Sequence, residues 1–269
     1  MIIVILSVVL VILLYVLSTM CRVNHPGLSA LRGWAYAHRG LHGDGVPENS
    51  MLAFRKALES GYGIELDVHL ISDGSLAVIH DSSLLRTAGV DICVEDLTED
   101  RLNDYCLEGT TEKIPLFNDV LNLYQGQAPL IVELKCVRNN YAALCRAVCD
   151  MLDRYSGAYC LESFDPRCIY WLRKNRPDLI RGQLTENYFK SKSVKIPWIL
   201  KFLLRNQMLN FLLRPDFVAY RYSDRKCLSN FLTEKLWDAQ SVTWTLKNQE
   251  EFDTAIKENR IPIFEGFCP

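Results

Sequence analysis

The sequence predicts an α/β protein, a (β/α)8 TIM barrel preceded by a transmembrane helix. Three observations lead to this fold class. An uncharged apolar run occupies residues 2–20. Apolar strand-like segments then alternate with helix-like segments from residue 34 to residue 269, as in a parallel sheet covered by helices. Nine strand-like segments are present, and eight remain when one is assigned to a hairpin. Eight parallel strands in about 250 residues are typical of this barrel.

The apolar run at residues 2–20 is long enough to be a membrane helix, since roughly 20 residues cross the hydrocarbon core of about 30 Å. We therefore expect an anchor at residues 1–21, a linker at residues 22–33 and the barrel at residues 34–269. A buried core helix is the alternative. Positive charges follow the run, and this predicts that the C-terminal domain lies in the cytoplasm: Arg22, Arg32, Arg39 and Arg55.

The composition excludes several classes of protein. Charged residues are 23% and hydrophobic residues 49% of the chain, so disorder is excluded. The formal net charge of −2 excludes a basic nucleic-acid binder, which needs clustered positive charge. The 10 cysteines contain no C-x-x-C pair, so buried thiols are a better interpretation than a disulfide or zinc framework.

The elements follow one another along the chain as repeated strand–helix units. Helices are expected near residues 50–60, stopped by Gly61, near 141–154, near 167–176, closed by Pro177, and near 249–259. Residues 94–112 read as an irregular, acidic connection. The strand-like segments are Trp34–His38, Gly63–Leu70, Leu76–His80, Leu130–Leu134, Ala158–Phe164, Leu179–Leu184, Phe217–Tyr222, Ser241–Leu246 and Ile261–Phe267.

The second and third strand-like segments are too close together for a helix between them. Asp73-Gly74 is the signal of a two-residue hairpin turn. With this turn, Asp67 opposes His80 on one face of the ribbon. Glu65 lies two residues before Asp67 and shares that face. The hairpin therefore predicts that two carboxylates and a histidine lie together.

Polar side chains interrupt or follow the buried strands at their carboxyl ends. Ordinary surface ion pairs explain each of them singly, but together they need a joint cause. Strand ends converge on one rim of a barrel, where three carboxylates repel one another unless a cation neutralises them. Oxygen ligands favour Mg²⁺ or Ca²⁺, and Arg and Lys bind phosphate. Two histidines complete the acid and base of a phosphodiester-cleaving site. The residues are His38, Arg39, Glu65, Asp67, His80, Glu133 and Lys135.

The same residues carry a resemblance to the glycerophosphodiester phosphodiesterase family. The shared motifs are His38-Arg39-Gly40, Pro47-Glu48-Asn49-Ser50, Glu65-x-Asp67, Asp73-Gly74, His80-Asp81, Glu133-x-Lys135, Ser163-Phe164 and Trp244-Thr245. The resemblance implies a TIM barrel that hydrolyses glycerophosphodiesters to an alcohol and glycerol 3-phosphate, with one divalent cation.

Roles for individual residues follow from the resemblance alone. It implies that His38 and His80 are the acid and base, and that Glu65, Asp67 and Glu133 bind the metal. It further implies that Arg39 and Lys135 contact phosphate. Glu48 belongs to the site, but whether it contacts the metal or orients His38 or Arg39 stays open. Phe164 and Trp244 match pocket-lining positions, with plain barrel core as the alternative.

The last strand departs from the family pattern. Many members end it with a Thr-Asp pair, whereas this chain reads Ile263-Phe264-Glu265-Gly266-Phe267, so a polar contact on the rim differs. The resemblance also leaves the substrate open, because some members act as phospholipase D-type enzymes on lysophospholipids. Phosphoinositide hydrolysis and a catalytically silent lipid-binding module are further alternatives.

Residues 186–215 form a long insertion on the predicted catalytic face, because they follow a strand. Apolar side chains around Trp198 and Phe202 alternate with basic ones such as Lys201 and Arg205. This composition is typical of a helix that lies on membrane lipid. A helix pair that packs on the barrel fits equally well.

Overall fold

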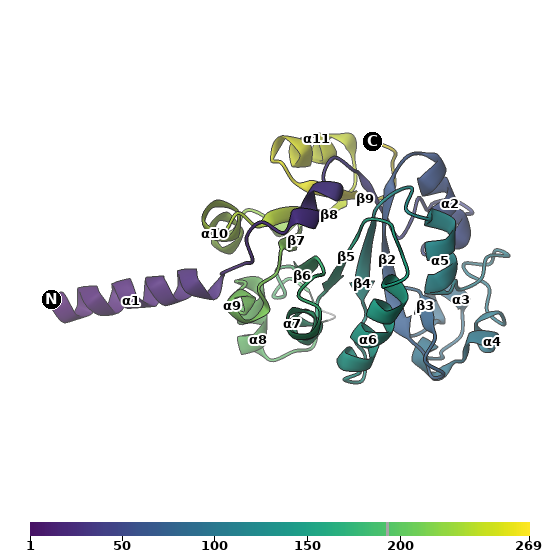
Figure 1. Ribbon diagram of the computed structural model, residues 1–269, viewed down its shortest axis with the longest axis horizontal. Coiled ribbons are helices and arrows are strands. Elements are labelled where there is room, and N and C mark those ends of the chain that lie inside the picture. Colours follow the sequence, from purple (N-terminus) through teal and green to yellow (C-terminus); the bar gives the residue numbers. More distant parts are fainter. Residues whose placement is uncertain (192–193) are drawn as a thin grey trace.

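In the computed structural model, which describes residues 1–191 and 194–269, nine strands form one closed sheet (Figure 1). The order is β1-β9-β8-β7-β6-β5-β4-β2-β3, and pairing of β1 with β2 closes the barrel. Eight strands are parallel and β3 is antiparallel to β2, so the predicted (β/α)8 barrel is confirmed. The strands are β1 (Tyr36–His38), β2 (Gly63–Leu70), β3 (Leu76–Val78), β4 (Leu130–Leu134), β5 (Tyr159–Ser163), β6 (Arg181–Thr185), β7 (Phe217–Arg221), β8 (Gln240–Leu246) and β9 (Ile261–Phe264).

Helices surround the barrel because alternate strand residues face outward. Ile64, Leu66 and Val68 of β2 pack in the outer core with Phe54 and Val120. Glu65 and Asp67 lie between them and therefore face the barrel interior. The helices are α2 (Met51–Glu59), α3 (Leu85–Ala88), α4 (Glu99–Leu102), α5 (Phe117–Tyr124), α6 (Tyr141–Leu152), α7 (Pro166–Asn175), α10 (Leu228–Leu236) and α11 (Gln249–Lys257), with 3₁₀ turns η2 (Val94–Asp96) and η3 (Tyr222–Asp224).

The segment predicted as a linker, residues 22–33, lies against the amino end of the barrel. Its 3₁₀ turn η1 (Pro26–Ala30) places Leu28, together with Leu31, in the inner core. The Tyr36 hydroxyl donates to the Leu31 carbonyl at 2.9 Å. Arg22 forms an ion pair with the fully buried Asp216. These contacts close the base of the barrel, opposite to the rim that carries the polar strand ends.

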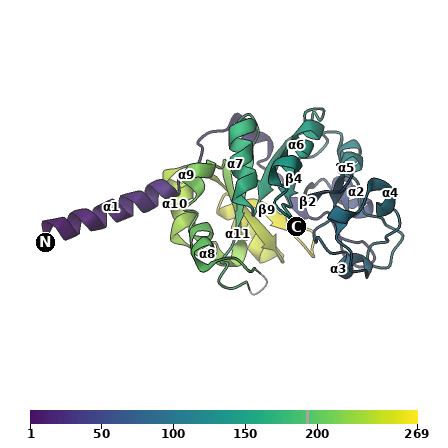
Figure 2. The same ribbon diagram turned by 90° about the horizontal axis from the view of Figure 1, so that it is seen from below.

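The predicted membrane anchor is wrong. Helix α1 (Ile2–Ser18) protrudes from the barrel in both views (Figure 1 and Figure 2), and its 17 residues extend about 26 Å. It ends at Ser18, because Thr19 and Cys21 are buried in the domain and Trp237 Nε1 donates to Thr19 Oγ1 at 3.1 Å. Among the described residues, no helix has both the length and the apolarity needed to cross a membrane. The predicted membrane location and cytoplasmic orientation lose their basis with the anchor.

The predicted hairpin register is wrong by one residue. Val68 pairs with Val78 and Leu70 with Leu76, and the Ile79 amide donates to the Asp67 carbonyl. The reason is a three-residue loop, in which Gly74 adopts a φ of +92°. β3 ends at Val78, so His80 lies beyond the regular strand and still reaches the cavity at the rim.

The insertion contains two short helices on the barrel, α8 (Trp198–Arg205) and α9 (Asn210–Leu213). Residues 192–193 of the insertion lie outside the described residues. Leu204 and Leu213 are buried, and Thr185 Oγ1 at the end of β6 donates to the Leu204 carbonyl at 3.1 Å. Trp198 on α8 is 70% exposed. One side of the insertion therefore packs on the barrel and the other exposes apolar side chains.

Candidate active site

The first strand ends in a sharp turn that presents both His38 and Arg39 to the rim. Arg39 has a φ of +55° and Gly40 a φ of +81°. A Cβ atom on Gly40 would lie 2.8 Å from Ala53 Cβ, so a larger residue does not fit. The turn directs the Arg39 backbone N–H to Glu65 Oε2 at 3.2 Å. The His-Arg-Gly motif thus links the ends of β1 and β2.

His38 forms a histidine–carboxylate pair with Glu265, the residue after β9. His38 Nδ1 lies 2.6 Å from Glu265 Oε2, and Lys247 Nζ lies 2.9 Å from Glu265 Oε1. Burial lowers the pKa of His38, while the hydrogen bond to Glu265 opposes this shift. The sequence analysis quoted Glu265 only within the departure of the last strand from the family pattern and gave it no role. In the structure, this glutamate contacts His38.

Three carboxylates from β2 and β4 form a buried cluster. One oxygen each of Glu65, Asp67 and Glu133 lies within 4.8 Å of the others. Two positively charged side chains contact this cluster. Lys135 Nζ lies 2.9 Å from Glu133 Oε1 and 3.2 Å from Asp67 Oδ1, and Arg39 Nε lies 3.4 Å from Asp67 Oδ2. Two positive side chains therefore face three acidic ones.

The pKa values show that these carboxylates are electrostatically unequal. Burial raises the pKa of Glu65 well above its ordinary value, and the charges of Asp67 and Glu133 add to the shift. Burial also raises the pKa of Glu133 to about 7, against the opposing effect of Lys135. For Asp67, burial acts upward, but Lys135 and its other cationic neighbours hold the pKa well below the ordinary value. Burial is thus the main cause of the raised pKa values, and the different positions of the charged neighbours explain why the three carboxylates differ.

The Pro-Glu-Asn-Ser motif supports the cluster from the loop before α2. Asn49, with a φ of +52°, donates from Nδ2 to Asp67 Oδ2 at 2.8 Å. Glu48 Oε1 accepts from Arg39 at 2.9 Å and from Arg86 at 2.6 Å. The Glu48 carboxylate therefore contacts Arg39, one of the two residues that the sequence analysis left open for it to orient.

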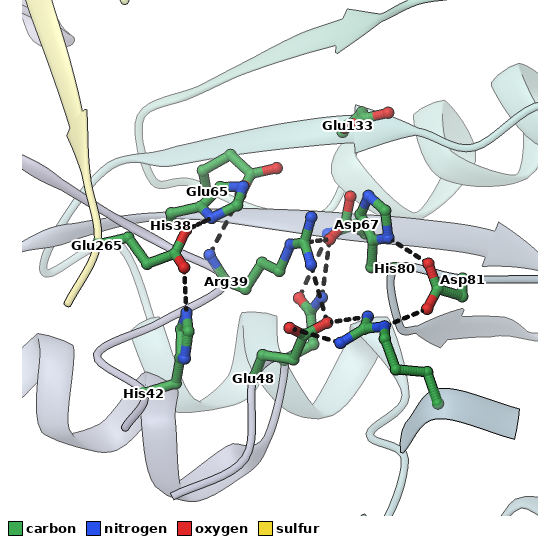
Figure 3. Close-up of polar contacts among 12 residues, drawn as sticks. His38, Arg39, His42, Glu48, Glu65, Asp67, His80, Asp81, Glu133 and Glu265 are labelled. Carbon is green, nitrogen blue, oxygen red and sulfur yellow. Dashed lines mark hydrogen bonds and ion pairs between the residues drawn. The ribbon is translucent and has the colours of Figure 1, made fainter. Parts of the chain in front are cut away.

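His80 forms a second histidine–carboxylate pair (Figure 3). Its Nδ1 lies 2.6 Å from Asp81 Oδ1, and Asp81 in turn accepts from Arg86 Nε at 2.5 Å. Burial lowers the pKa of His80 to about 4, and the nearby Asp67 only partly offsets this shift. With Nδ1 engaged, Nε2 is the ring nitrogen that remains for the cavity.

A small cavity of about 40 Å³ lies at the centre of the rim. It adjoins a groove of about 340 Å³ that shares His80, Glu133 and Phe164 with it. The rings of Phe164 and Trp244 pack edge to face with centroids 5.5 Å apart, and Trp244 Nε1 donates to the Ala219 carbonyl. The cavity is lined by His38, Arg39, Glu65, His80, Glu133, Glu162, Phe164, Leu184, Trp244 and Ile263.

The structure brings the predicted site residues together. Asp67 and Lys135 contact the residues that line the cavity, and Glu48 lies one contact further out, on Arg39. The sequence analysis named no role for Asn49, which it quoted only within a motif. It also missed Glu162, a buried carboxylate inside the strand β5. Burial and the charge of Glu133 raise the pKa of Glu162 well above its ordinary value.

The cluster of Glu65, Asp67 and Glu133 fits a hard divalent cation. Its donors are all carboxylate oxygens, which suit Mg²⁺ or Ca²⁺ better than zinc. Asp67 Oδ1 is buried without a hydrogen bond of good geometry, which leaves a lone pair for a ligand. A second group of possible ligands, His38, His42 and Glu265, has Lys247 bound to its carboxylate, so it fits a cation less well.

Comparison with known proteins agrees with this geometry. The model of the glycerophosphoryl diester phosphodiesterase family matches residues 38–262, and the chain therefore belongs to this family. A glycerophosphodiester phosphodiesterase of Bacillus altitudinis is 40% identical over 113 residues, which are 39% of this chain and 46% of that enzyme. Lysophospholipase D GDPD1 of Homo sapiens is 32% identical over 133 residues, which are 45% of this chain and 41% of that protein. The chain thus matches less than half the length of these two relatives.

A solved structure shares the fold over nearly the whole chain. A phosphodiesterase from Oleispira antarctica, in complex with the product sn-glycerol-3-phosphate, has a TM-score of 0.73 and 18% sequence identity to this chain. The match covers 89% of this chain and 94% of that one.

The contact between His38 and Glu265 makes a prediction about protonation. Replacing the carboxylate by an amide, in Glu265→Gln, removes the group that stabilises the charged imidazole, so the pKa of His38 should fall further. An NMR titration of the imidazole signals measures this pKa. Glu250→Gln, in the first turn of α11, is the control and should leave the pKa unchanged. An unchanged or higher pKa in Glu265→Gln contradicts the pairing.

Proposed function

We propose that this protein is a glycerophosphodiester phosphodiesterase, which hydrolyses glycerophosphodiesters to an alcohol and sn-glycerol 3-phosphate. The observation that carries the proposal is one cavity with two histidine–carboxylate pairs and three clustered carboxylates. The name of the Bacillus altitudinis relative and the product in the Oleispira antarctica structure support the same substrate class. In this proposal residues 34–269 form the catalytic domain, with residues 186–215 beside its active-site rim.

The charge and shape of the cavity residues indicate which part of the substrate each of them contacts. Arg39 and Lys135 are the cations beside the cavity, and we assign them to the phosphate, which Arg binds through parallel hydrogen bonds. Phe164 and Trp244 provide an apolar wall for the carbon atoms of the substrate. Glu48 accepts a hydrogen bond from Arg39 and so holds the guanidinium in place.

Glu65, Asp67 and Glu133 would hold one divalent cation, Mg²⁺ or Ca²⁺. When bound, this cation supplies positive charge that polarises a phosphoryl oxygen and neutralises the carboxylates. Lys135 contributes to the same neutralisation through Asp67 and Glu133.

His38 and His80 act as the general acid and base. Both have a lowered pKa, so both are mainly neutral near pH 7 before substrate binds. Each ring has a carboxylate at Nδ1, which leaves Nε2 to exchange a proton with the reactants. One neutral histidine takes the proton of the attacking nucleophile at Nε2. The other first binds a proton from solvent, which the negative charge of the bound phosphate favours, and as the imidazolium it then protonates the leaving alcohol.

The test of this function is identification of the product. The full chain, stripped of metal and then given Mg²⁺ or Ca²⁺, should convert glycerophosphocholine to choline and glycerol 3-phosphate, identified by mass. His38→Ala and His80→Ala should each lower kcat by roughly 10²–10⁴, because each removes a positioned acid or base. Lys56→Ala on the outer helix α2 is the control and should retain the wild-type rate.

Two results oppose the proposal. Wild-type rates in both histidine variants exclude their acid–base roles. If neither choline nor glycerol 3-phosphate forms with either metal, this substrate class is excluded. That result favours a phosphoinositide enzyme or a silent lipid-binding module.

A second substrate class, lysophospholipids, is favoured by the surface of the insertion. Trp198, Ile199 and Phe202 on α8 are 70%, 48% and 42% exposed, and Lys201 and Arg205 lie on the same helix. Exposed aromatic and basic side chains of this kind bind lipid surfaces. The similarity to lysophospholipase D GDPD1 supports this alternative. The product in this case is lysophosphatidic acid.

Substitutions on α8 separate the two substrate classes. If lysophospholipid is the substrate, Trp198→Ser with Phe202→Ser should lower kcat/KM on micellar lysophosphatidylcholine about tenfold, since apolar contact area is lost. Turnover of the water-soluble glycerophosphocholine should not change. Ile256→Ser, on the exposed face of α11, is the matched control. Equal rates on micelles for the α8 variant and the wild type contradict a role of α8 in lipid binding.

A further inference from the structure

Glu162 lies in the same row of the barrel as two carboxylates of the cluster. Asp67 of β2 pairs in register with Glu133 of β4, and Glu133 pairs with Glu162 of β5. Side chains in register on neighbouring parallel strands point to the same side of the sheet. The three carboxylates therefore face the barrel interior at one level, on three adjacent strands.

The Glu162 carboxylate is buried without a partner that explains it. The residue is 1% exposed, and its Oε2 has no hydrogen-bond partner. Among the described residues, no Lys, Arg or His forms an ion pair with it, whereas Glu133 is paired with Lys135. A buried polar group without a partner costs free energy, and a buried carboxylate costs the most. A purely structural role would be filled better by an apolar residue.

The position of this carboxylate explains its presence. Glu162 lines the same cavity as Glu65 and Glu133, which belong to the proposed cation site. It does not belong to the group of three whose oxygens lie within 4.8 Å of one another. A carboxylate at this place would accept hydrogen bonds from water molecules that a hard cation retains when it binds.

We propose that Glu162 is a fourth acidic group of the divalent-cation site and increases its affinity through the hydration shell of the cation. This inference rests on the proposed function, because it requires a cation at Glu65, Asp67 and Glu133. It assigns Glu162 as a positioning residue for the cation, with no proton transfer of its own.

Calorimetric titration of the metal-free full chain with MgCl₂, and separately with CaCl₂, tests the proposal. Glu162→Gln keeps the shape of the side chain and removes its charge, so the Kd of the cation should rise about tenfold, as for other groups behind metal ligands. Glu133→Gln removes a proposed direct ligand and should raise the Kd further. Glu234→Gln, on α10 and outside the cavity, is the matched control and should bind as the wild type does.

A melting curve of each metal-free protein shows that the variants fold. The rise in Tm caused by saturating cation should be smaller for Glu162→Gln than for the wild type, because weaker binding stabilises less. A Kd equal to the wild-type value in Glu162→Gln, with weaker binding in Glu133→Gln, overturns the role of Glu162 and leaves the proposed function intact. A wild type that binds neither cation overturns the proposed cation site itself, and the role of Glu162 with it.

Discussion

The buried cluster of negative charge at the ends of β2 and β4 is the constraint on which the rest of the site depends. Three carboxylates lie within 4.8 Å of one another inside a barrel, where like charges repel strongly. Lys135 and Arg39 compensate part of this charge through Asp67. Burial, together with the charge that remains, raises the pKa values of Glu65 and Glu133. The proposed divalent cation among these carboxylates would satisfy this arrangement.

The same constraint explains the polar network around the histidines. Arg39 contacts Asp67 on one side and Glu48 on the other. Glu48 then binds Arg86, whose guanidinium also pairs with Asp81, the partner of His80. A chain of alternating charges thus runs from the cluster to the second histidine (Figure 3). Each charged side chain in this series is therefore held between oppositely charged neighbours.

Most of the candidate site was predicted from polar residues at the carboxyl ends of predicted strands. Parallel strands bring these ends to one rim of the barrel, independently of the conformation of the loops. The prediction failed for details that depend on local geometry. The Ser72–Gly74 loop shifted the hairpin by one residue, which composition does not reveal. Glu162 went unnoticed because the strand was predicted to run to Phe164, which placed this glutamate inside the strand and not at its end. The apolar run of residues 2–20 predicted a longer helix than α1. The sequence does not reveal where this helix ends, because the contacts that bury Thr19 come from residues far along the chain, such as Trp237.

In the proposed site, one divalent cation binds among Glu65, Asp67 and Glu133, beside His38 and His80. Mn²⁺ substitutes for Mg²⁺ at oxygen-ligand sites and scatters X-rays anomalously. An anomalous difference map from crystals of the full chain soaked in MnCl₂ therefore shows where the cation binds. We expect one strong peak between the three carboxylates. Anomalous density at His42 and Glu265 instead, or no peak in the cavity at a saturating concentration of Mn²⁺, would contradict the proposed site.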